Sequence, residues 1–476
     1  MRASRRDVLL GASALAQTLI IGGCASRYIA DADSFDTSAL RSRFSGELIS
    51  PKDARYEMAR RTQNLAFDHR PKLIARCATT EDVVRVLEFG RRRNALIAIR
   101  SGGHSQAGQS SCDGGVVIDL TKMNHISIDT VGATINCGPG ALIWQVYQAS
   151  AVTGLTLPLG TYPTVGVAGL TLGGGLGFLS GVAGAACDSL IGAEIVLADG
   201  RIVTVDEQRD PDLMWALRGA GANFGIVTRL TFRAFRQDKV LAGNLVFPSA
   251  AARDVLGLVN EMPATTPDEL TVSALVLAPP NRESQVVLQP CWSGDSAQGR
   301  QVIDQYLTRV VRPVAGELVE TTHAQFVGTH DEGPSAYFMR WGQASNKLAD
   351  AALDILVDSH DVPPAARLII MQTLHGVAAR TAPRATAFPH FVPGVSAGFN
   401  AIWKDDSGAA ETKVWSEKTW AKLHPYMNSA YVNMLGDEGS SRVREAYGVN
   451  YTRLRQLKAR YDRDNVFRMN QNIPPA

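Results

Sequence analysis

Two glycine-rich segments contain the residues of this chain that are best suited to hold a flat, charged ligand. The first, Arg100-Ser-Gly-Gly-His-Ser-Gln-Ala-Gly108, follows a short apolar run. Backbone N–H groups freed by glycine can turn inward around a pyrophosphate, and Arg100 would add positive charge. In the second, Leu159 to Gly177, eight of nineteen residues are glycine or alanine, so a flat ligand could lie against bare backbone. Tight turns alone rarely need such runs of glycine, so we predict a ligand cradle.

Several familiar kinds of site are excluded by spacing. Gly173, Gly175 and Gly177 do not form the Gly-x-Gly-x-x-Gly pattern that opens a dinucleotide-binding βαβ unit, and the run Trp215 to Gly225 leads into a strand. The phosphate loop of nucleotidases, His-Glu-x-x-His and Gly-x-Ser-x-Gly are absent. No Cys-x-x-Cys pair is present, so we expect no metal site.

The composition describes an ordinary large globular protein. The chain has 476 residues, is 45% hydrophobic and carries a formal net charge of +2. This length allows roughly two or three domains. A net charge so close to zero makes nucleic acid an unlikely partner class on electrostatic grounds. The cysteines at 77, 112, 137, 187 and 291 are expected to be buried thiols.

The elements that would position the glycine-rich segments alternate between strand and helix. Residues 80–89 have a capping threonine and apolar positions at helical spacing, which predicts a helix. Strands are predicted at 97–100, 116–120, 134–137, 191–197 and 225–232. From about 237 to 422 glycine becomes sparser, a long alternating strand is predicted at 270–277 and a helix at 348–359. A charged helix is expected within 450–472, and the fold class is α+β.

The first 26 residues have the composition of an export signal. Ser4-Arg5-Arg6-Asp7-Val8-Leu9 resembles the twin-arginine signal, whose pathway carries proteins already folded with their cofactor. Ile21-Gly22-Gly23-Cys24 resembles a lipoprotein cleavage box, so we expect an exported, periplasmic protein with a lipid anchor at Cys24. A plain signal cleaved near Cys24 and a retained anchor helix are the alternatives. Any membrane contact is expected only through this N-terminal anchor.

Five motifs in order resemble those of the covalent-flavin oxidases like berberine bridge enzyme, within the vanillyl-alcohol-oxidase superfamily, and the match runs from about residue 68 to the end of the sequence. The motifs are Arg100-Ser-Gly-Gly-His-Ser105, Pro163-Thr-Val-Gly-Val-Ala-Gly169 with Leu172-Gly-Gly-Gly-Leu-Gly177, Trp215 to Thr228, Tyr431-Val-Asn433, and Tyr447-Gly-Val-Asn450 with Phe467-Arg-Met-Asn-Gln-Asn-Ile473.

The resemblance implies a PCMH-type FAD-binding domain of two subdomains, interrupted by an α+β substrate domain with an antiparallel sheet. The FAD-binding domain would comprise 27–236 and 426–476, and the substrate domain 237–425.

His104 would be bonded through its ring to the 8α-methyl group of the flavin, because a neutral imidazole nitrogen is a good nucleophile toward an electrophilic methylene. The expected cofactor-binding residues are Arg100, Ser101, Gly102, Gly103, His104, Ser105, Gly108, Gly160, Thr161, Tyr162, Thr164, Val165, Gly166, Gly169, Gly173, Gly174, Gly175, Gly177, Gly225, Ile226, Val227 and Asn470.

Two departures from the family pattern affect the chemistry. Many relatives attach the flavin a second time through a cysteine where this chain has Tyr162, so we expect a single covalent link, through His104. Relatives often carry a catalytic tyrosine where this chain has Met434, which has no proton to exchange.

The replacement base is undetermined, and the candidates are Tyr162, Tyr431 and His390. Tyr431 would point to the opposite side if its motif were a strand. Further candidates to line the face opposite the glycine cradle are Tyr337, Arg340 and Trp403.

The resemblance implies an oxidase. A hydride would move from a small alcohol, sugar or aromatic or amine substrate to FAD, and O₂ would be reduced to hydrogen peroxide. Valine at position 165 would permit oxygen access. A dehydrogenase that uses another electron acceptor is one alternative. A flavin-binding lipoprotein without catalysis, favoured by Met434, is the other.

Overall fold

The computed structural model describes residues 35–279, 283–328, 333–358, 366–403 and 408–476. The predicted export signal, including Cys24, lies outside these residues. The helices are α1 (Ser38–Arg41), α2 (Tyr56–Arg60), α3 (Thr80–Arg92), α4 (Ile143–Ala151), α5 (Val167–Leu172), α6 (Ser180–Ala183), α7 (Pro211–Ala220), α8 (Ala252–Glu261), α9 (Ser296–Leu307), α10 (His323–Val327), α11 (Asp350–Asp358), α12 (Gly376–Arg380), α13 (Ala409–Leu423), α14 (Ser440–Tyr447) and α15 (Tyr451–Tyr461). Within the described part of the chain, no helix is long and apolar enough to cross a membrane.

A four-stranded mixed sheet lies at the N-terminal end. Its order is β1-β2-β4-β3, with β1 (Glu47–Ile49), β2 (Leu73–Arg76), β3 (Ile97–Arg100) and β4 (Val116–Asp119). Helix α3 forms as predicted: the Thr79 side chain accepts a hydrogen bond from the Asp82 N–H, and Val83, Val86 and Leu87 are buried. The helix continues three residues beyond the predicted end.

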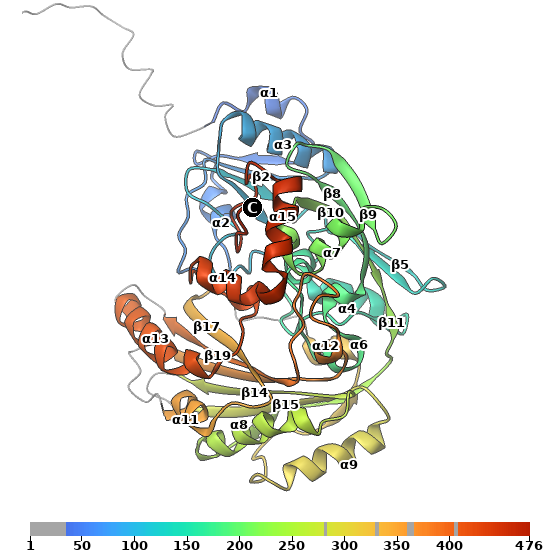
Figure 1. Ribbon diagram of the computed structural model, residues 1–476, viewed down its shortest axis with the longest axis vertical. Helices are drawn as coiled ribbons and strands as arrows, with labels where there is room; N and C mark the ends of the chain where they lie inside the picture. Colours follow the sequence, from blue (N-terminus) through green and yellow to red (C-terminus); the bar gives the residue numbers. More distant parts are fainter. Residues whose placement is uncertain (1–34, 280–282, 329–332, 359–365, 404–407) are drawn as a thin grey trace, which may run out of the picture.

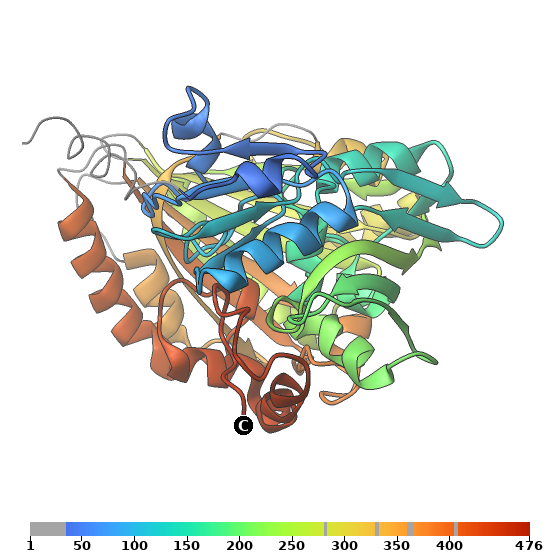
Figure 2. The same cartoon turned by 90° about the horizontal axis from the view of Figure 1, so that it is seen from above.

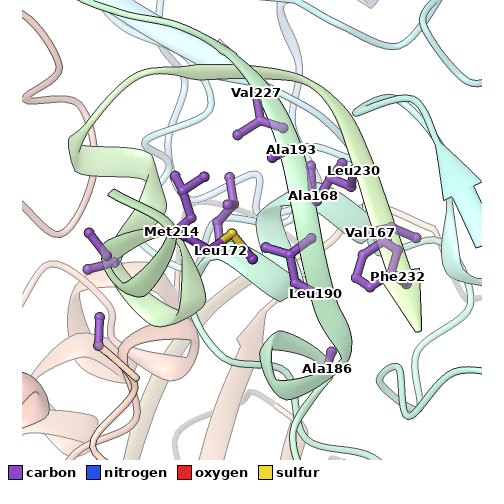
Figure 3. Close-up of a cluster of buried hydrophobic side chains, with 14 of the residues drawn as sticks. Val167, Ala168, Leu172, Ala186, Leu190, Ala193, Met214, Val227, Leu230 and Phe232 are labelled. Carbon is purple, nitrogen blue, oxygen red and sulfur yellow. The ribbon is translucent and has the colours of Figure 1, made fainter. Parts of the chain in front are cut away.

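A five-stranded antiparallel sheet follows in the order β5-β6-β10-β8-β9. Its strands are β5 (Ile126–Asp129), β6 (Thr134–Cys137), β8 (Leu190–Val196), β9 (Ile202–Asp206) and β10 (Ile226–Arg233). Helices α5 and α7 pack against it. In Figure 3, Val167, Ala168 and Leu172 of α5 lie in one cluster with Met214 of α7 and with side chains of β8 and β10. This burial fixes the helix that carries the second glycine-rich segment.

An eight-stranded antiparallel sheet forms the other half of the molecule, in the order β16-β12-β15-β14-β18-β19-β17, with β13 also paired to β15. Its strands are β12 (Val240–Ala242), β13 (Leu245–Phe247), β14 (Leu270–Ala278), β15 (Gln285–Trp292), β16 (Val319–Thr321), β17 (Ala336–Ser345), β18 (Ala366–Leu374) and β19 (Gly394–Trp403), while β7 (Leu155–Thr156) and β11 (Phe235–Arg236) form a separate pair. Helices α8, α9, α11 and α13 cover the outer face (Figure 1). The inner face is turned toward the two smaller sheets.

The chain returns to the first half after α13. Helix α15 packs beside α7, and both views show the red C-terminal helices against elements from the N-terminal half (Figures 1 and 2). The predicted α+β class is confirmed, and the strands predicted from 97 to 277 are present with ends shifted by at most one residue. All five cysteines of the described chain are buried thiols, as predicted.

Candidate cofactor cavity and substrate side

A cavity of about 300 Å³ lies where the loop after β3, the second glycine-rich segment, the start of β10 and the C-terminal segment meet. None of its lining residues in the described chain is Asp, Glu, Lys or Arg. Any anion held here would therefore be bound by backbone N–H groups and by uncharged polar side chains. The described residues also contain no group of three or more side chains suited to bind a metal ion.

The two glycine-rich segments touch through bare backbone. A Cβ on Gly102 would lie 2.3 Å from the Gly166 backbone nitrogen, so neither position has room for a side chain. Ser101 fixes the same turn because its hydroxyl donates a hydrogen bond to the Pro139 carbonyl at 2.5 Å. Gly103 has φ +76°, a conformation that favours glycine, and the space beside its α-carbon is open. The loop therefore presents backbone to the cavity.

His104 is held at the cavity wall from two sides. Its Nε2 lies 3.0 Å from the Thr164 hydroxyl, and its ring meets Tyr162 edge to face with ring centroids 5.6 Å apart. Both partners come from the second glycine-rich segment. The imidazole is thus oriented by the segment whose glycines form the neighbouring wall.

Tyr431 does not belong to a strand, because a 3₁₀ turn (Val432–Met434) follows it. The residue is among those that line the cavity. The hydroxyl accepts hydrogen bonds from the Gly175 N–H at 2.8 Å and from Asn433 Nδ2 at 2.9 Å. Burial raises the pKa of Tyr431 above its ordinary value, so the phenol stays protonated at neutral pH.

The C-terminal segment closes one side of the cavity. Asn470 Nδ2 donates to the Ala222 carbonyl at 2.8 Å, while its Oδ1 is buried at the cavity wall without a protein partner. Lys458 holds this segment in place: its fully buried ammonium donates to Asp462, to the Asn223 carbonyl and to the Phe467 carbonyl at 2.7 to 2.8 Å.

Asn64 joins the His104 loop to the large sheet. Its Nδ2 donates to the carbonyls of Gln106 and Tyr337, both at 3.1 Å, and its Oδ1 accepts from the Tyr337 N–H. The Gln106 side chain also hydrogen-bonds the Tyr337 phenol. These contacts bring the inner face of β17 next to the cavity.

Most of the predicted cofactor residues line the cavity. They are Ser101, Gly102, Gly103, His104, Ser105, Gly160, Thr161, Tyr162, Val165, Gly166, Gly169, Gly173, Gly225, Ile226, Val227 and Asn470. Thr164 is not among the lining residues, and its hydroxyl contacts His104. Gly108, Gly174, Gly175 and Gly177 stand behind the wall, where they allow close packing against Phe67, Phe388, Ala186 and the Leu159 carbonyl, respectively.

The prediction that Arg100 supplies charge to the cradle is wrong. Its guanidinium is buried on the other side of β3, where it donates to the carbonyls of Ala59, Arg60 and Ser110. The side chain therefore braces the loop and does not reach the ligand space.

His390, a predicted catalytic residue, is not among the residues that line the cavity. Its ring is closed off from the cavity, with Nε2 3.0 Å from Asp188 Oδ1 and Nδ1 3.1 Å from the Ala378 carbonyl.

None of the three further candidates on the substrate side lines the cavity, but Tyr337 is joined to it by a hydrogen bond between its phenol and the cavity residue Gln106. Trp403 packs on Phe338 with ring centroids 4.6 Å apart. Arg340 is an even-numbered residue of β17, so its side chain leaves the strand on the face opposite to that of Tyr337, and it donates a hydrogen bond to the Met339 carbonyl. The cavity wall also contains residues that sequence reasoning missed: Gln106, Asn223, Asn433, Tyr447, Met469 and Gln471. All six lie inside the motifs described in the sequence analysis, so their places in these motifs were the available signal.

These features fit FAD. The bare-backbone wall can receive a flat ring, the uncharged cradle of N–H groups suits a pyrophosphate, and the orphaned Asn470 Oδ1 offers an acceptor to a ligand N–H or O–H. His104 adds a nucleophilic nitrogen at the wall.

Comparison with known proteins agrees with this fit. The family described as "FAD binding domain" matches residues 71–206, and the family described as "Berberine and berberine like" matches residues 430–474. The chain is 30% identical to the (R)-6-hydroxynicotine oxidase of Paenarthrobacter nicotinovorans, over 90% of this chain and 97% of that protein. It is also 30% identical to an uncharacterized FAD-linked oxidoreductase of Bacillus subtilis, over 91% and 98% of the two chains.

Two solved structures have the same fold. The crystal structure of 6-hydroxy-D-nicotine oxidase from Arthrobacter nicotinovorans aligns with TM-score 0.81 and 26% identity, covering 91% of this chain and 98% of that chain. A variant of berberine bridge enzyme aligns with TM-score 0.81 and 21% identity over 90% and 97% of the two chains.

Proposed function

Because the chain belongs to the FAD-linked oxidoreductases of the berberine bridge enzyme type, we propose that it is an oxidase of a small alcohol, sugar or aromatic or amine substrate, with O₂ as electron acceptor and hydrogen peroxide as product. When bound, FAD supplies a ring that accepts a hydride and passes its electrons to O₂. The observation that carries the proposal is His104 at the edge of an uncharged cavity walled by glycine backbone.

His104 would form the single covalent link to the flavin. The Thr164 hydroxyl lies 3.0 Å from His104 Nε2 and would help to orient the imidazole for this bond. A second link of the thioether type has no ligand here, because Tyr162 carries a phenol where a cysteine would be needed.

We assign the removal of the substrate proton to Tyr162. It is the more accessible of the two tyrosines, with 42% of its surface exposed, and it lies beside His104. Tyr431 is a weaker candidate, since its hydroxyl is occupied by two N–H donors and burial raises its pKa. We infer that Tyr431 instead braces the glycine wall. Tyr162 would act as the phenolate, accept the substrate proton to become the neutral phenol, and then release that proton to solvent.

The cofactor test uses acid precipitation of the purified protein. We expect the yellow colour to stay with the pellet and the intact mass to exceed the chain mass by one FAD. His104→Ala should release all colour into the supernatant, whereas His125→Ala, an exposed histidine of the same half, should retain it. Colour that stays bound in the His104→Ala pellet would refute the assignment of the link.

The acceptor test follows the reduced enzyme after anaerobic addition of substrate. Fast reoxidation by dissolved oxygen with stoichiometric peroxide is the expected result. Slow reoxidation by oxygen with fast turnover on a quinone or dye would instead identify a dehydrogenase.

Met434 gives one specific reason to consider a flavin-binding protein without catalysis, because it removes a proton-exchanging group from the cavity wall. Failure of alcohols, sugars and aromatic amines to bleach the flavin under anaerobic conditions would favour that second function.

We further propose export through the twin-arginine route, with lipid attachment at Cys24 of the N-terminal segment. A flavoprotein that must fold around its cofactor before leaving the cytoplasm suits that route. The expected result is periplasmic, membrane-associated enzyme that stays in the cytoplasm when Arg5 and Arg6 are both replaced by lysine. Cys24→Ser should be exported but released from the membrane.

A further inference from the structure

The inner face of the large sheet is apolar where it meets the cavity. The side chains that form this sheet-face cluster are Tyr337, Met339, Trp341, Ile370, Ile402 and Met434. Met434 belongs to the cavity wall, and the other five come from β17, β18 and β19. The cluster therefore meets the wall of the cofactor cavity at Met434.

Tyr337 connects the cluster to the cavity. Its phenol is hydrogen-bonded by Gln106, a cavity residue, and lies near Tyr162. Only 8% of the Tyr337 surface is exposed, and burial raises its pKa above the ordinary value. A neutral phenol thus stands at the polar end of an otherwise apolar wall.

Asn400 is the polar exception on this face. In the register of the sheet it is directly opposite both Met339 of β17 and Leu368 of β18, and directly opposite residues share a face. It therefore lies in the row between the Tyr337–Ile402 pair and the Trp341–Gly398 pair. Its Oδ1 is buried and has no hydrogen-bond partner in the protein.

An unpaired buried acceptor is costly unless a ligand supplies a donor. No lining residue of the cavity and no member of the sheet-face cluster carries a formal charge. A charged substrate would lose its hydration without gaining an ion partner, and most hydroxyls of a sugar would face hydrocarbon.

We propose that the substrate is a neutral, flat and mainly apolar molecule with an O–H or N–H group that donates to Asn400 Oδ1, which makes Asn400 a specificity-determining residue. This inference rests on the proposed function, since it takes the space beside the cavity as the substrate site. Of the substrate classes proposed above, the inference keeps aromatic alcohols and neutral aromatic amines. It excludes oligosaccharides as substrates.

Binding to the flavin-loaded protein is measured by anaerobic equilibrium dialysis with three probes: 1-naphthylmethanol, its methyl ether and cellobiose. The alcohol should bind at least about tenfold more tightly than cellobiose and about fivefold more tightly than the ether, the difference that one neutral hydrogen bond makes. Asn400→Leu should bring the ratio of alcohol to ether close to one while leaving the affinity for the ether unchanged. Asn124→Leu, an exposed residue of the other half, should keep the wild-type ratio.

Tighter binding of cellobiose than of the alcohol would overturn the inference, and so would an unchanged ratio of alcohol to ether in Asn400→Leu. The unchanged affinity for the ether shows that the variant is folded. Because dialysis measures binding and not turnover, these outcomes are separate from a failure of the proposed oxidase function, which would show as colourless protein or as flavin that no substrate bleaches.

Discussion

Replacing His323 with phenylalanine should stabilise the protein and remove part of its sensitivity to acid. His323 begins α10, and its ring packs edge to face on Tyr147 with centroids 4.6 Å apart. Neither ring nitrogen has a hydrogen-bond partner, and burial lowers the pKa of His323 from 6.5 to about 3. Phenylalanine keeps the ring contact and removes the buried polar nitrogens.

The magnitude follows from proton linkage. Between pH 6.5 and pH 3 the unfolded chain binds a proton at this position and the folded chain does not, so stability falls as the pH falls through 6.5. At about 1.36 kcal/mol per pH unit, acidification to pH 5 costs the native protein about 2 kcal/mol at this one site. In addition, the variant does not bury an unpaired N–H group. Avoiding this desolvation penalty should raise its free energy of unfolding by roughly 1–3 kcal/mol at neutral pH.

The assay is urea denaturation of wild type and His323→Phe at pH 7.5 and pH 5.0, with exposed His125→Phe as the matched control. The variant should be more stable at both pH values, and its advantage should grow by about 2 kcal/mol at pH 5.0. An advantage that stays constant with pH, or that appears equally in the control, would refute the reasoning. A destabilised variant at pH 7.5 would mean that the ring nitrogens have partners in solution.

Three further changes test the cavity itself. Lys458→Met breaks a fully buried ion pair and should lower the free energy of unfolding by about 3–5 kcal/mol with loss of bound FAD, measured by denaturation and by absorbance. Tyr162→Phe should lower kcat by about 10²-fold to 10⁴-fold in stopped-flow reduction with the flavin still bound, whereas exposed Tyr426→Phe should not. Gly102→Ala forces its methyl group against the Gly166 nitrogen, so we expect mostly colourless protein on purification; full flavin content would contradict the close approach.

The fold could be predicted from the sequence wherever local patterns and burial agree. The helix at Thr80 has its own capping residue, an amphipathic face and a basic last turn, so its position does not depend on distant parts of the chain. The motif at Tyr431 could not be assigned in the same way. Three residues are too few to show the periodicity of a strand or of a helix. The turn at Val432–Met434 also depends on hydrogen bonds to Gly175 and Leu170, which are distant in the sequence.

For the candidate site, the sequence revealed the glycine wall but not the direction of individual side chains. Arg100 belongs to the first glycine motif, yet the alternation of β3 turns it toward buried carbonyls instead of the cavity. The link made by Asn64 was invisible in the sequence because both of its partners, Gln106 and Tyr337, are far along the chain and bind it mainly through backbone groups.

Asn470 and its neighbours form one wall of the cavity and contact Ala222, which lies 248 positions earlier in the chain. During synthesis the ribosome must therefore release almost all of both halves before this wall exists. Until residues 469–473 have emerged, the glycine loops have nothing to close against on that side. We therefore expect the cofactor to be loaded only after this segment has been synthesised, and a nascent chain stalled in the second half should carry no tightly held flavin.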